Sequence, residues 1–261
     1  MGKCFLKKLL VQSPASDFIA TGKDEDEVDQ LKKEFPGVAF TCSNEEAVSS
    51  ASIIILCLKP QTFSVLLDIS DCFNGKTVIS IMASVSLSKL QESFPQSLVY
   101  RCMTNVASLV GEAMTVISCH DLTQLSTVRT IFENFGQVLV FPSSADGSSV
   151  DEEKRMNLVT AICGSGPAFF ALFLESFVDA SVMLGMSRSD AKLLASQTMK
   201  GTAELVLKGG MSPVQVKEHV GTPGGCTMAG LMELEEGKVR STVAKCLEVT
   251  AEKASKLSCR K

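Results

Sequence analysis

The sequence predicts a doubly wound α/β domain followed by an all-helical domain. Short apolar runs alternate with amphipathic helical stretches as far as Pro142, and this alternation is typical of a parallel sheet covered by helices. From Asp151 onward the strong signals are helical. The segment 143–150 between the two halves is small and polar, so we expect the domains to span residues 1–149 and 150–261.

The uninterrupted apolar run Ser52–Leu58 is the clearest strand of the first half, because strands buried on both faces of a parallel sheet carry such runs. Thr77–Ala83 repeats the pattern. Asn44 has a side chain suited to capping a helix, and it precedes the helical stretch EEAVSSA. The other expected strands are Asp17–Thr21, Val38–Cys42, Leu98–Cys102, Thr115–Ser118 and Gln137–Phe141, and the other expected helices of this half are Lys3–Leu10 and Asp24–Phe35.

The second half contains long helical stretches that end at glycines. Ala168–Leu184 is followed by Gly185, and Asp190–Lys208 is followed by Gly209. A helix as apolar as the first of these usually faces another chain or the centre of a bundle, which predicts self-association as a dimer or a larger oligomer. Further helices are expected over Met228–Leu234 and Val239–Leu257.

The composition argues against several classes of protein. Hydrophobic residues make up 45% of the 261 residues, which is enough to bury a core. A net charge of −4, a single Tyr and no Trp argue against a nucleic-acid partner. Ten isolated cysteines and two histidines lack zinc-ligand spacing, so we expect reduced thiols and no metal. The basic, apolar start MGKCFLKKLLVQS is too short and interrupted to span a membrane, and we expect a cytoplasmic protein without a membrane partner.

The beginning of the chain departs from the pattern of a nucleotide-binding domain. Such a domain opens with a strand, a glycine-rich turn and a helix whose N-terminus holds a pyrophosphate. Here only Met1 and Gly2 precede the helix Lys3–Leu10, and no G-x-G-x-x-G occurs in the first half. We expect that the first strand is missing and that Gly2 is the last glycine of the motif. The alternative is an ordinary start of an unrelated fold.

Three candidate site residues follow predicted strands of the first half. Nucleotide ligands bind at the carboxyl end of such sheets, so Lys59 is either a phosphate contact or a solvated loop lysine. The backbone near Ala83 is a candidate lining for a nicotinamide pocket. Asn105 either fixes its own loop by bonding the backbone or contacts a cofactor.

Two glycine-containing turns of the second half open helices. In TAICGSGPAFF (Thr160–Phe170), Pro167 fits the first turn of a helix. The N–H groups at this helix start are a candidate anion site, and the alternative is a tight helix–helix crossing that needs the small residues. TPGGCT (Thr222–Thr227) combines a sharp turn, a helix start and two hydroxyls, which suits a small carboxylate. No acid–base pair accompanies it, so the site favours orienting a substrate for hydride transfer from a nicotinamide cofactor.

Together these blocks resemble pyrroline-5-carboxylate reductase from Met1 to near Leu257. The most specific blocks are RCMTN (Arg101–Asn105), VTAICGSGPAFF (Val159–Phe170) and TPGGCTMAGLMELEEG (Thr222–Gly237). The resemblance implies a Rossmann-type domain, here without its first strand, and a helical dimerisation domain. It implies reduction of 1-pyrroline-5-carboxylate to L-proline in proline biosynthesis, with NADP(H) or NAD(H) as the cofactor.

The resemblance also implies roles for individual residues. The catalytic cleft would contain Thr160, Ser165 and Thr227, and the substrate would be bound by Thr222, Gly224, Gly225 and Thr227. The cofactor would contact Gly2, Asn44, Lys59, Ala83 and Asn105, with Asn44 at the adenosine ribose and Lys59 near the phosphates. The chain departs from the usual family residues at Ser84 and Ala113, which replace glycine, and at Val106-Ala107, which replaces Thr-Pro.

Two other hypotheses stay open. A catalytically impaired family member would keep the helical domain as a pairing surface, because a missing first strand leaves a sheet position unpaired and the pyrophosphate unanchored. A dehydrogenase of the related hydroxyacid type would need a catalytic lysine on a long helix, for which Lys192 and Lys200 are candidates. The choice between NADPH and NADH depends on residues 22–24 after the second strand, where one basic and one acidic side chain occur.

Overall fold

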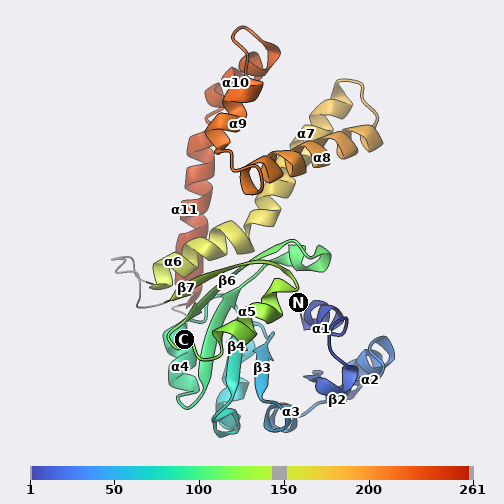
Figure 1. Ribbon diagram of the computed structural model, residues 1–261, viewed down its shortest axis with the longest axis vertical. Coiled ribbons are helices and arrows are strands. Elements are labelled where there is room, and N and C mark those ends of the chain that lie inside the picture. Colours follow the sequence, from blue (N-terminus) through green and yellow to red (C-terminus); the bar gives the residue numbers. More distant parts are fainter. Residues whose placement is uncertain (1, 143–151, 259–261) are drawn as a thin grey trace. The chain divides into compact units, whose positions relative to one another are not determined.

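The computed structural model describes residues 2–142 and 152–258 (Figure 1). The predicted boundary within 143–150 lies outside the described residues. The chain divides into two compact units. Unit 1 comprises Met1–Ser165 together with Thr250–Lys261, and unit 2 comprises Gly166–Val249.

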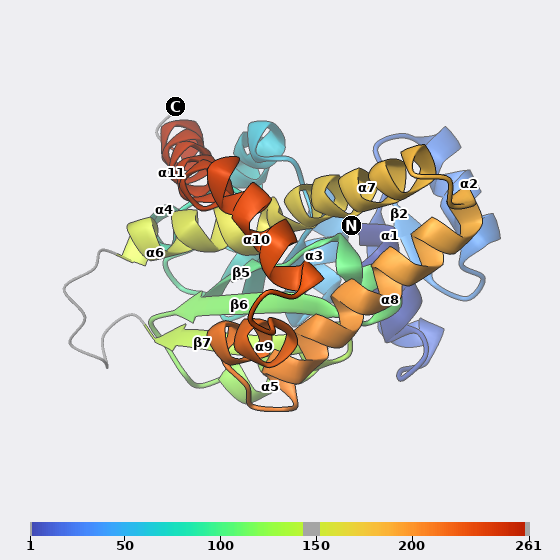
Figure 2. The same cartoon turned by 90° about the horizontal axis from the view of Figure 1, so that it is seen from above.

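Unit 1 is built on a five-stranded sheet with the order β3-β4-β5-β6-β7. Figure 2 shows β5, β6 and β7 of this sheet. β3, β4 and β5 are parallel, but β6 pairs antiparallel with β5 and parallel with β7. The predicted sheet was parallel throughout. Only residues 104–112 join β5 to β6, and this connection is too short for the helical crossover that parallel neighbours need. The strands are β3 (Ile53–Leu56), β4 (Thr77–Ser80), β5 (Leu98–Met103), β6 (Ala113–Cys119) and β7 (Gly136–Pro142).

Two short strands, β1 (Ile19–Thr21) and β2 (Ala39–Thr41), form a separate parallel sheet. Among the described residues, β1 pairs only with β2, and β3 pairs only with β4. The order in a doubly wound domain would place one more strand between β1 and β3. Among the described residues, the strands of unit 1 are therefore divided between two sheets.

Helices cover both faces of the larger sheet, as the predicted doubly wound arrangement requires. On one face Phe5 packs its ring against Phe132 and Phe135, with ring centroids 5.5 and 4.4 Å apart. On the other face a second cluster includes Val48, Leu66 and Leu90, which are buried against β3, β4 and β5. The helices are α1 (Gly2–Leu9), α2 (Glu25–Glu34), α3 (Asn44–Ser50), the 3₁₀ segment Pro60–Phe73, α4 (Leu87–Ser93) and α5 (Leu125–Glu133).

The N-cap of α3 differs from the prediction. Ser43, not Asn44, caps this helix, and its hydroxyl accepts a hydrogen bond of 3.2 Å from the N–H of Glu46. Ser43 has the extended backbone that an N-cap needs, and Asn44 is already the first helical residue. Both residue types cap helices well, so the sequence does not distinguish the two positions.

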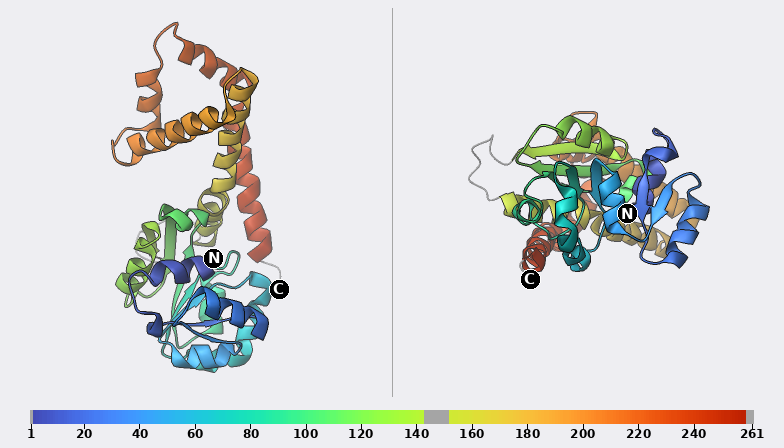
Figure 3. Two further views of the ribbon diagram at one scale, coloured as in Figure 1. Left: turned by 90° about the vertical axis from the view of Figure 1, so that its right-hand side faces the viewer. Right: turned by 90° about the horizontal axis from the view of Figure 1, so that it is seen from below.

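The chain then enters α6 (Glu152–Val159), which belongs to unit 1 and continues into a wide π-helical turn, Thr160–Gly164. Unit 2 contains α7 (Gly166–Met183), α8 (Arg188–Leu207), α9 (Pro213–Val220), α10 (Cys226–Glu236) and the first part of α11 (Val239–Ser258). α7 and α8 pack against one another across a short connection (Figure 3). α9 was not predicted from the sequence, although Ser212 and Gln215 form a capping box with Pro213 at the first position.

Candidate functional site

Three predicted cofactor residues lie at one edge of the five-stranded sheet. Lys59, Ala83 and Asn105 follow the carboxyl ends of β3, β4 and β5, and these strands run in the same direction. The start of α1 lies at this edge too, because a Cβ placed on Gly2 would lie 3.5 Å from the Cβ of Cys57, just beyond β3. Asn44 follows β2 in the smaller sheet. The carboxyl ends of parallel strands beside a helix start form an arrangement that is typical of nucleotide-binding sites.

Lys59 is exposed and sits immediately before Pro60, with the extended backbone that a residue preceding proline adopts. Its ammonium group adds a positive charge to the carboxyl edge of the sheet. The first N–H groups of α1 lie at the same edge and have no partner within the helix. A lysine and a helix N-terminus are two features that favour a bound phosphate group.

Ala83 and Ser84 form the bend after β4. Ala83 is partly buried and packs against a cluster that contains Met103 and Met156. Ser84 adopts φ +64°, a left-handed conformation that is unfavourable for a residue with a Cβ. The family's usual glycine would adopt this conformation without strain. The structure therefore holds the backbone in a glycine-like conformation although serine occupies the position.

Asn105 fixes its own loop. Its side-chain oxygen accepts a hydrogen bond of 3.0 Å from the N–H of Ala107, and the turn ends at Gly111 in the left-handed conformation. This contact is the first of the two roles that the sequence left open. Asn105 remains partly exposed at the sheet edge.

The π-helical turn after α6 carries Thr160 and Ser165. The Thr160 hydroxyl donates to the carbonyl of Met156 at 2.8 Å, and the Ser165 N–H donates to the carbonyl of Thr160 at 2.9 Å. Gly164 faces Met103, whose sulfur would lie 3.4 Å from an added Cβ. π-helical turns occur frequently at functional sites, and this one packs on the end of β5.

The turn Thr222–Thr227 in unit 2 is built around its two glycines. Gly224 has φ +70°, which favours glycine, and Gly225 caps α10 with an extended backbone. The N–H of Gly225 donates to the carbonyl of Thr222 at 3.0 Å, so this group is not available to a ligand. The N–H groups of Cys226 and Thr227, in the first turn of α10, have no acceptor within the helix. Within the part of the chain that the structure describes, the N–H groups of Cys226 and Thr227 and the hydroxyls of Thr222 and Thr227 are thus available to an anion.

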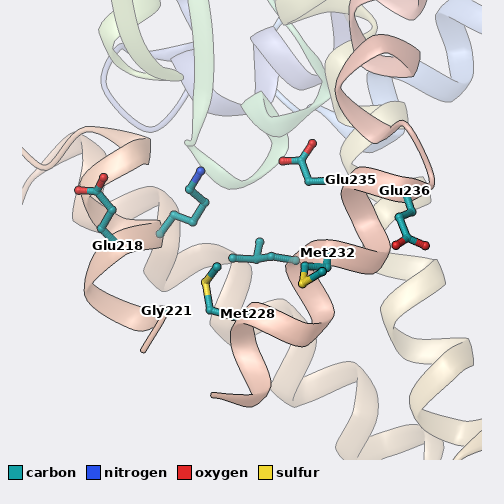
Figure 4. A pocket seen from close by; sticks show the side chains of 8 residues that line it. Glu218, Gly221, Met228, Met232, Glu235 and Glu236 are labelled. Carbon is teal, nitrogen blue, oxygen red and sulfur yellow. The ribbon is translucent and has the colours of Figure 1, made fainter. Parts of the chain in front are cut away.

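A pocket of about 570 Å³ lies between α9 and α10, the two helices that this turn connects (Figure 4). Gly221 immediately precedes the turn and Met228 immediately follows it. Apolar side chains of Met228, Leu231 and Met232 line the pocket together with the charged Lys217, Glu218, Glu235 and Glu236. The turn residues themselves are not part of the lining, so the pocket is adjacent to the predicted substrate residues but does not contain them.

The thiols near the sheet edge are uncharged at neutral pH. Burial raises the pKa of Cys57 to about 11 and also raises the pKa of Cys163. Within 2–142 and 152–258, no group of three or more His, Cys, Asp or Glu side chains is placed to hold a metal ion. Gly2, Asn44, Lys59, Ala83, Asn105, Thr160 and Ser165 lie in unit 1, whereas Thr222, Gly224, Gly225 and Thr227 lie in unit 2.

The continuous helical stretch Glu152–Met183 is long and apolar enough to cross a membrane, judged by length and composition alone. It starts with charged residues that contact the sheet, including Glu152 and Glu153. In α7 the side chains of Phe170, Leu172 and Phe177 are more than half exposed. An exposed apolar face of this kind marks an interaction surface.

Two family models match the chain. Pyrroline-5-carboxylate reductase dimerisation matches residues 153–257, which include α7 and its exposed apolar face. NADP oxidoreductase, coenzyme F420-dependent, matches residues 1–84, which include β1 to β4. The helical half is thus a dimerisation domain, and the first half is similar to an NADP-dependent oxidoreductase.

Relatives of known function are similar over most of the chain. A pyrroline-5-carboxylate reductase from Synechocystis sp. is 35% identical over 233 residues, covering 88% of this chain and 83% of the relative. The crystal structure of Plasmodium falciparum pyrroline carboxylate reductase with NADP bound has a TM-score of 0.84 and 29% identity, covering 99% and 94% of the two chains. A Coxiella burnetii pyrroline-5-carboxylate reductase has a TM-score of 0.85 and 26% identity, covering 99% and 95%. The chain belongs to the pyrroline-5-carboxylate reductase family.

Proposed function

We propose that this chain catalyses the NADP(H)-dependent reduction of 1-pyrroline-5-carboxylate to L-proline, the reaction named in its relatives. The turn Thr222–Thr227 at the start of α10 carries the proposal, because its left-handed Gly224 and the N–H groups in the first turn of α10 suit a small carboxylate. The cofactor supplies the hydride to the imine carbon when it is bound. This role places the chain in amino-acid biosynthesis, and we further propose a cytoplasmic location.

The residues at the carboxyl edge of the sheet fit a dinucleotide. Lys59 and the N-terminus of α1 at Gly2 supply positive electrostatic potential for the phosphates. Asn44 lies after β2, and the family resemblance would place it at the adenosine ribose. The backbone at Ala83 and the loop fixed by Asn105 would frame the nicotinamide. These five side-chain and backbone positions would hold the cofactor but would not themselves react.

The substrate would be held by backbone donors and hydroxyls. Thr222 and Thr227 would hydrogen-bond the substrate around its carboxylate, with Gly224 and Gly225 shaping the turn so that no side chain obstructs it. Thr160 and Ser165 are proposed to orient the imine nitrogen. Thr160 donates its hydroxyl proton to Met156, so its oxygen is left with acceptor capacity toward a protonated imine.

NADPH is the proposed preference over NADH. The Asp24 carboxylate accepts a hydrogen bond of 2.9 Å from the N–H of Glu27 and caps α2. A carboxylate used in this way is less available to a ribose hydroxyl, which is the contact that NAD-dependent domains use. Lys23, beside it, is exposed and supplies a positive charge for a 2′-phosphate.

A non-catalytic pairing subunit is the second candidate, and the divided sheet favours it. β1 and β3 each have one partner strand among the described residues, so the region that anchors the pyrophosphate lacks support from a continuous sheet. Absorbance at 340 nm, followed with pyrroline-5-carboxylate and each cofactor, decides between the candidates. Oxidation of NADPH above background supports the reductase, whereas no oxidation at high protein concentration contradicts it. Calorimetric NADPH binding separates a loss of cofactor binding from a loss of chemistry.

A further inference from the structure

Arg101 is a buried charge in the middle of the sheet. It lies on β5 with 1% of its surface exposed, between Ser80 of β4 and Ser118 of β6 in the register of the strands. Both serines are fully buried. A guanidinium charge buried at this depth needs a partner carboxylate. That partner comes from α6.

Glu153 meets Arg101 as a two-point ion pair. Nη1 of Arg101 lies 2.6 Å from Oε2 of Glu153, and Nη2 lies 3.3 Å from Oε1. The two planar groups therefore fix both the distance and the orientation of α6 over β5. A lysine ammonium would supply the charge without this orientation.

Neighbouring contacts fasten the same end of α6 to the adjacent strands. Ser118 of β6 donates to Oε1 of Glu152 at 2.8 Å, and this oxygen is 3.9 Å from Nη1 of Arg101. The guanidinium carbon of Arg155 lies 4.1 Å from the ring centroid of Phe141 on β7. The first turns of α6 are thus attached to β5, β6 and β7 by charged side chains.

The same helix leads directly into the proposed site. Beyond Arg155, Met156 and Val159 are buried against Met103 and Val116. The chain then forms the π-helical turn that carries Thr160 and Ser165. A rotation or shift of α6 would displace these two residues from the sheet edge that carries Ala83 and Asn105.

We propose that the Arg101–Glu153 pair is a positioning element of the reductase: it fixes α6 on the sheet and thereby places Thr160 and Ser165 for the substrate. This inference rests on the proposed function. Arg101 contacts neither proposed substrate residue, so it acts through α6. Its Nε has no hydrogen-bond partner among the described residues, which lowers the benefit of the pair for stability. Well-packed apolar residues often replace buried ion pairs without loss of stability, but they do not fix an orientation in the same way.

The test compares four variants with the wild-type protein. Arg101→Lys keeps the charge and removes the two-point geometry, and Glu153→Gln removes one charge. The double variant R101M/E153L replaces the pair by apolar side chains, which avoids an unpaired buried charge. Arg129→Lys is the matched control, because Arg129 and Glu133 form an exposed pair with an Nε–Oε1 distance of 2.7 Å.

We expect KM for pyrroline-5-carboxylate to rise about tenfold in Arg101→Lys, in Glu153→Gln and in the double variant, because small displacements of orienting groups reduce binding and rate strongly. The calorimetric Kd for NADPH should change less than about twofold, since Lys59, Ala83 and Asn105 do not lie on α6. The double variant should keep the wild-type melting temperature. A double variant with wild-type KM would overturn the proposal.

Hydrogen exchange separates this proposal from the proposed function. Amides of residues 156–165 should exchange faster in Arg101→Lys and in the double variant, while amides of α5 should not change. If the wild-type protein does not oxidise NADPH, the reductase proposal fails, and the exchange measurement still decides whether the pair positions α6. Unchanged exchange at residues 156–165 contradicts the positioning role whatever the activity.

Discussion

Gly225 lies directly against the hydroxyl of Thr222. A Cβ added to Gly225 would overlap the Thr222 Oγ1 atom and would approach the Thr222 carbonyl oxygen to 3.0 Å. The two residues form one small unit in which the glycine leaves room for the hydroxyl. This relationship makes the turn a sensitive place to test the proposed substrate site.

The substitution Gly225→Ala should displace Thr222 and raise KM for pyrroline-5-carboxylate about tenfold or more, because the displaced hydroxyl no longer meets the carboxylate. Steady-state kinetics at saturating NADPH measure this effect. Gly201→Ala is the control, because a Cβ at this position in α8 meets no atom within 4 Å. Equal KM values for the two variants would argue against a substrate role for the turn.

Ser84→Gly should stabilise the protein by about 1 kcal/mol, because glycine adopts the left-handed conformation without the Cβ clash that serine suffers. Urea unfolding followed by circular dichroism gives the free energy. Lys238→Gly is the matched comparison, since Lys238 has φ +56° at the end of α10. A gain at Lys238 without one at Ser84 would mean that a local interaction of serine compensates for the strain.

Lys23→Glu should lower NADPH affinity about tenfold and leave NADH affinity nearly unchanged, because the substitution places a negative charge where the 2′-phosphate is expected. Calorimetric titration with both cofactors measures the two affinities. Lys33→Glu makes the same charge change near the other end of α2 and serves as the control. If Lys23→Glu lowered the affinities for NADPH and NADH equally, Lys23 would attract both cofactors and would not recognise the 2′-phosphate.

Stability should fall as the pH rises above about 9. Burial raises the pKa of Cys57 and of Cys119 from 9.0 to about 11 each. The unfolded chain therefore loses these protons first, and the stability contributed by the neutral buried thiols is lost between pH 9 and pH 11. We expect a loss of about 1 kcal/mol per thiol between pH 8 and pH 10. Urea unfolding of Cys119→Ala should show a shallower decline, and an identical decline would assign the effect to other groups.

Much of the fold is encoded in neighbouring residues. The apolar run Ser52–Leu58 contains β3, and the stretch Asp190–Lys208 corresponds closely to α8. The period of the hydrophobic residues and the capping of helices depend on neighbouring residues, so both can be recognised in the sequence. The turn around Gly224 belongs to the same class, because its left-handed conformation depends on one residue type.

Other features depended on contacts between distant residues. The direction of β6 followed from a short connection and from pairing with β5, and periodicity carries no information on strand direction. The choice of Ser43 over Asn44 as a cap depended on where the backbone of α3 becomes helical.

The sequence by itself determined the alternation of strands and helices, the glycine turns and the family, because these reside in short blocks of adjacent residues. The tertiary structure decided which residues that are distant in the sequence come into contact. Arg101 and Glu153 are 52 residues apart, and their pairing exists only because α6 packs over β5. Burial makes that contact energetically necessary, since a charge removed from water requires a partner, and burial is a property of the folded chain alone.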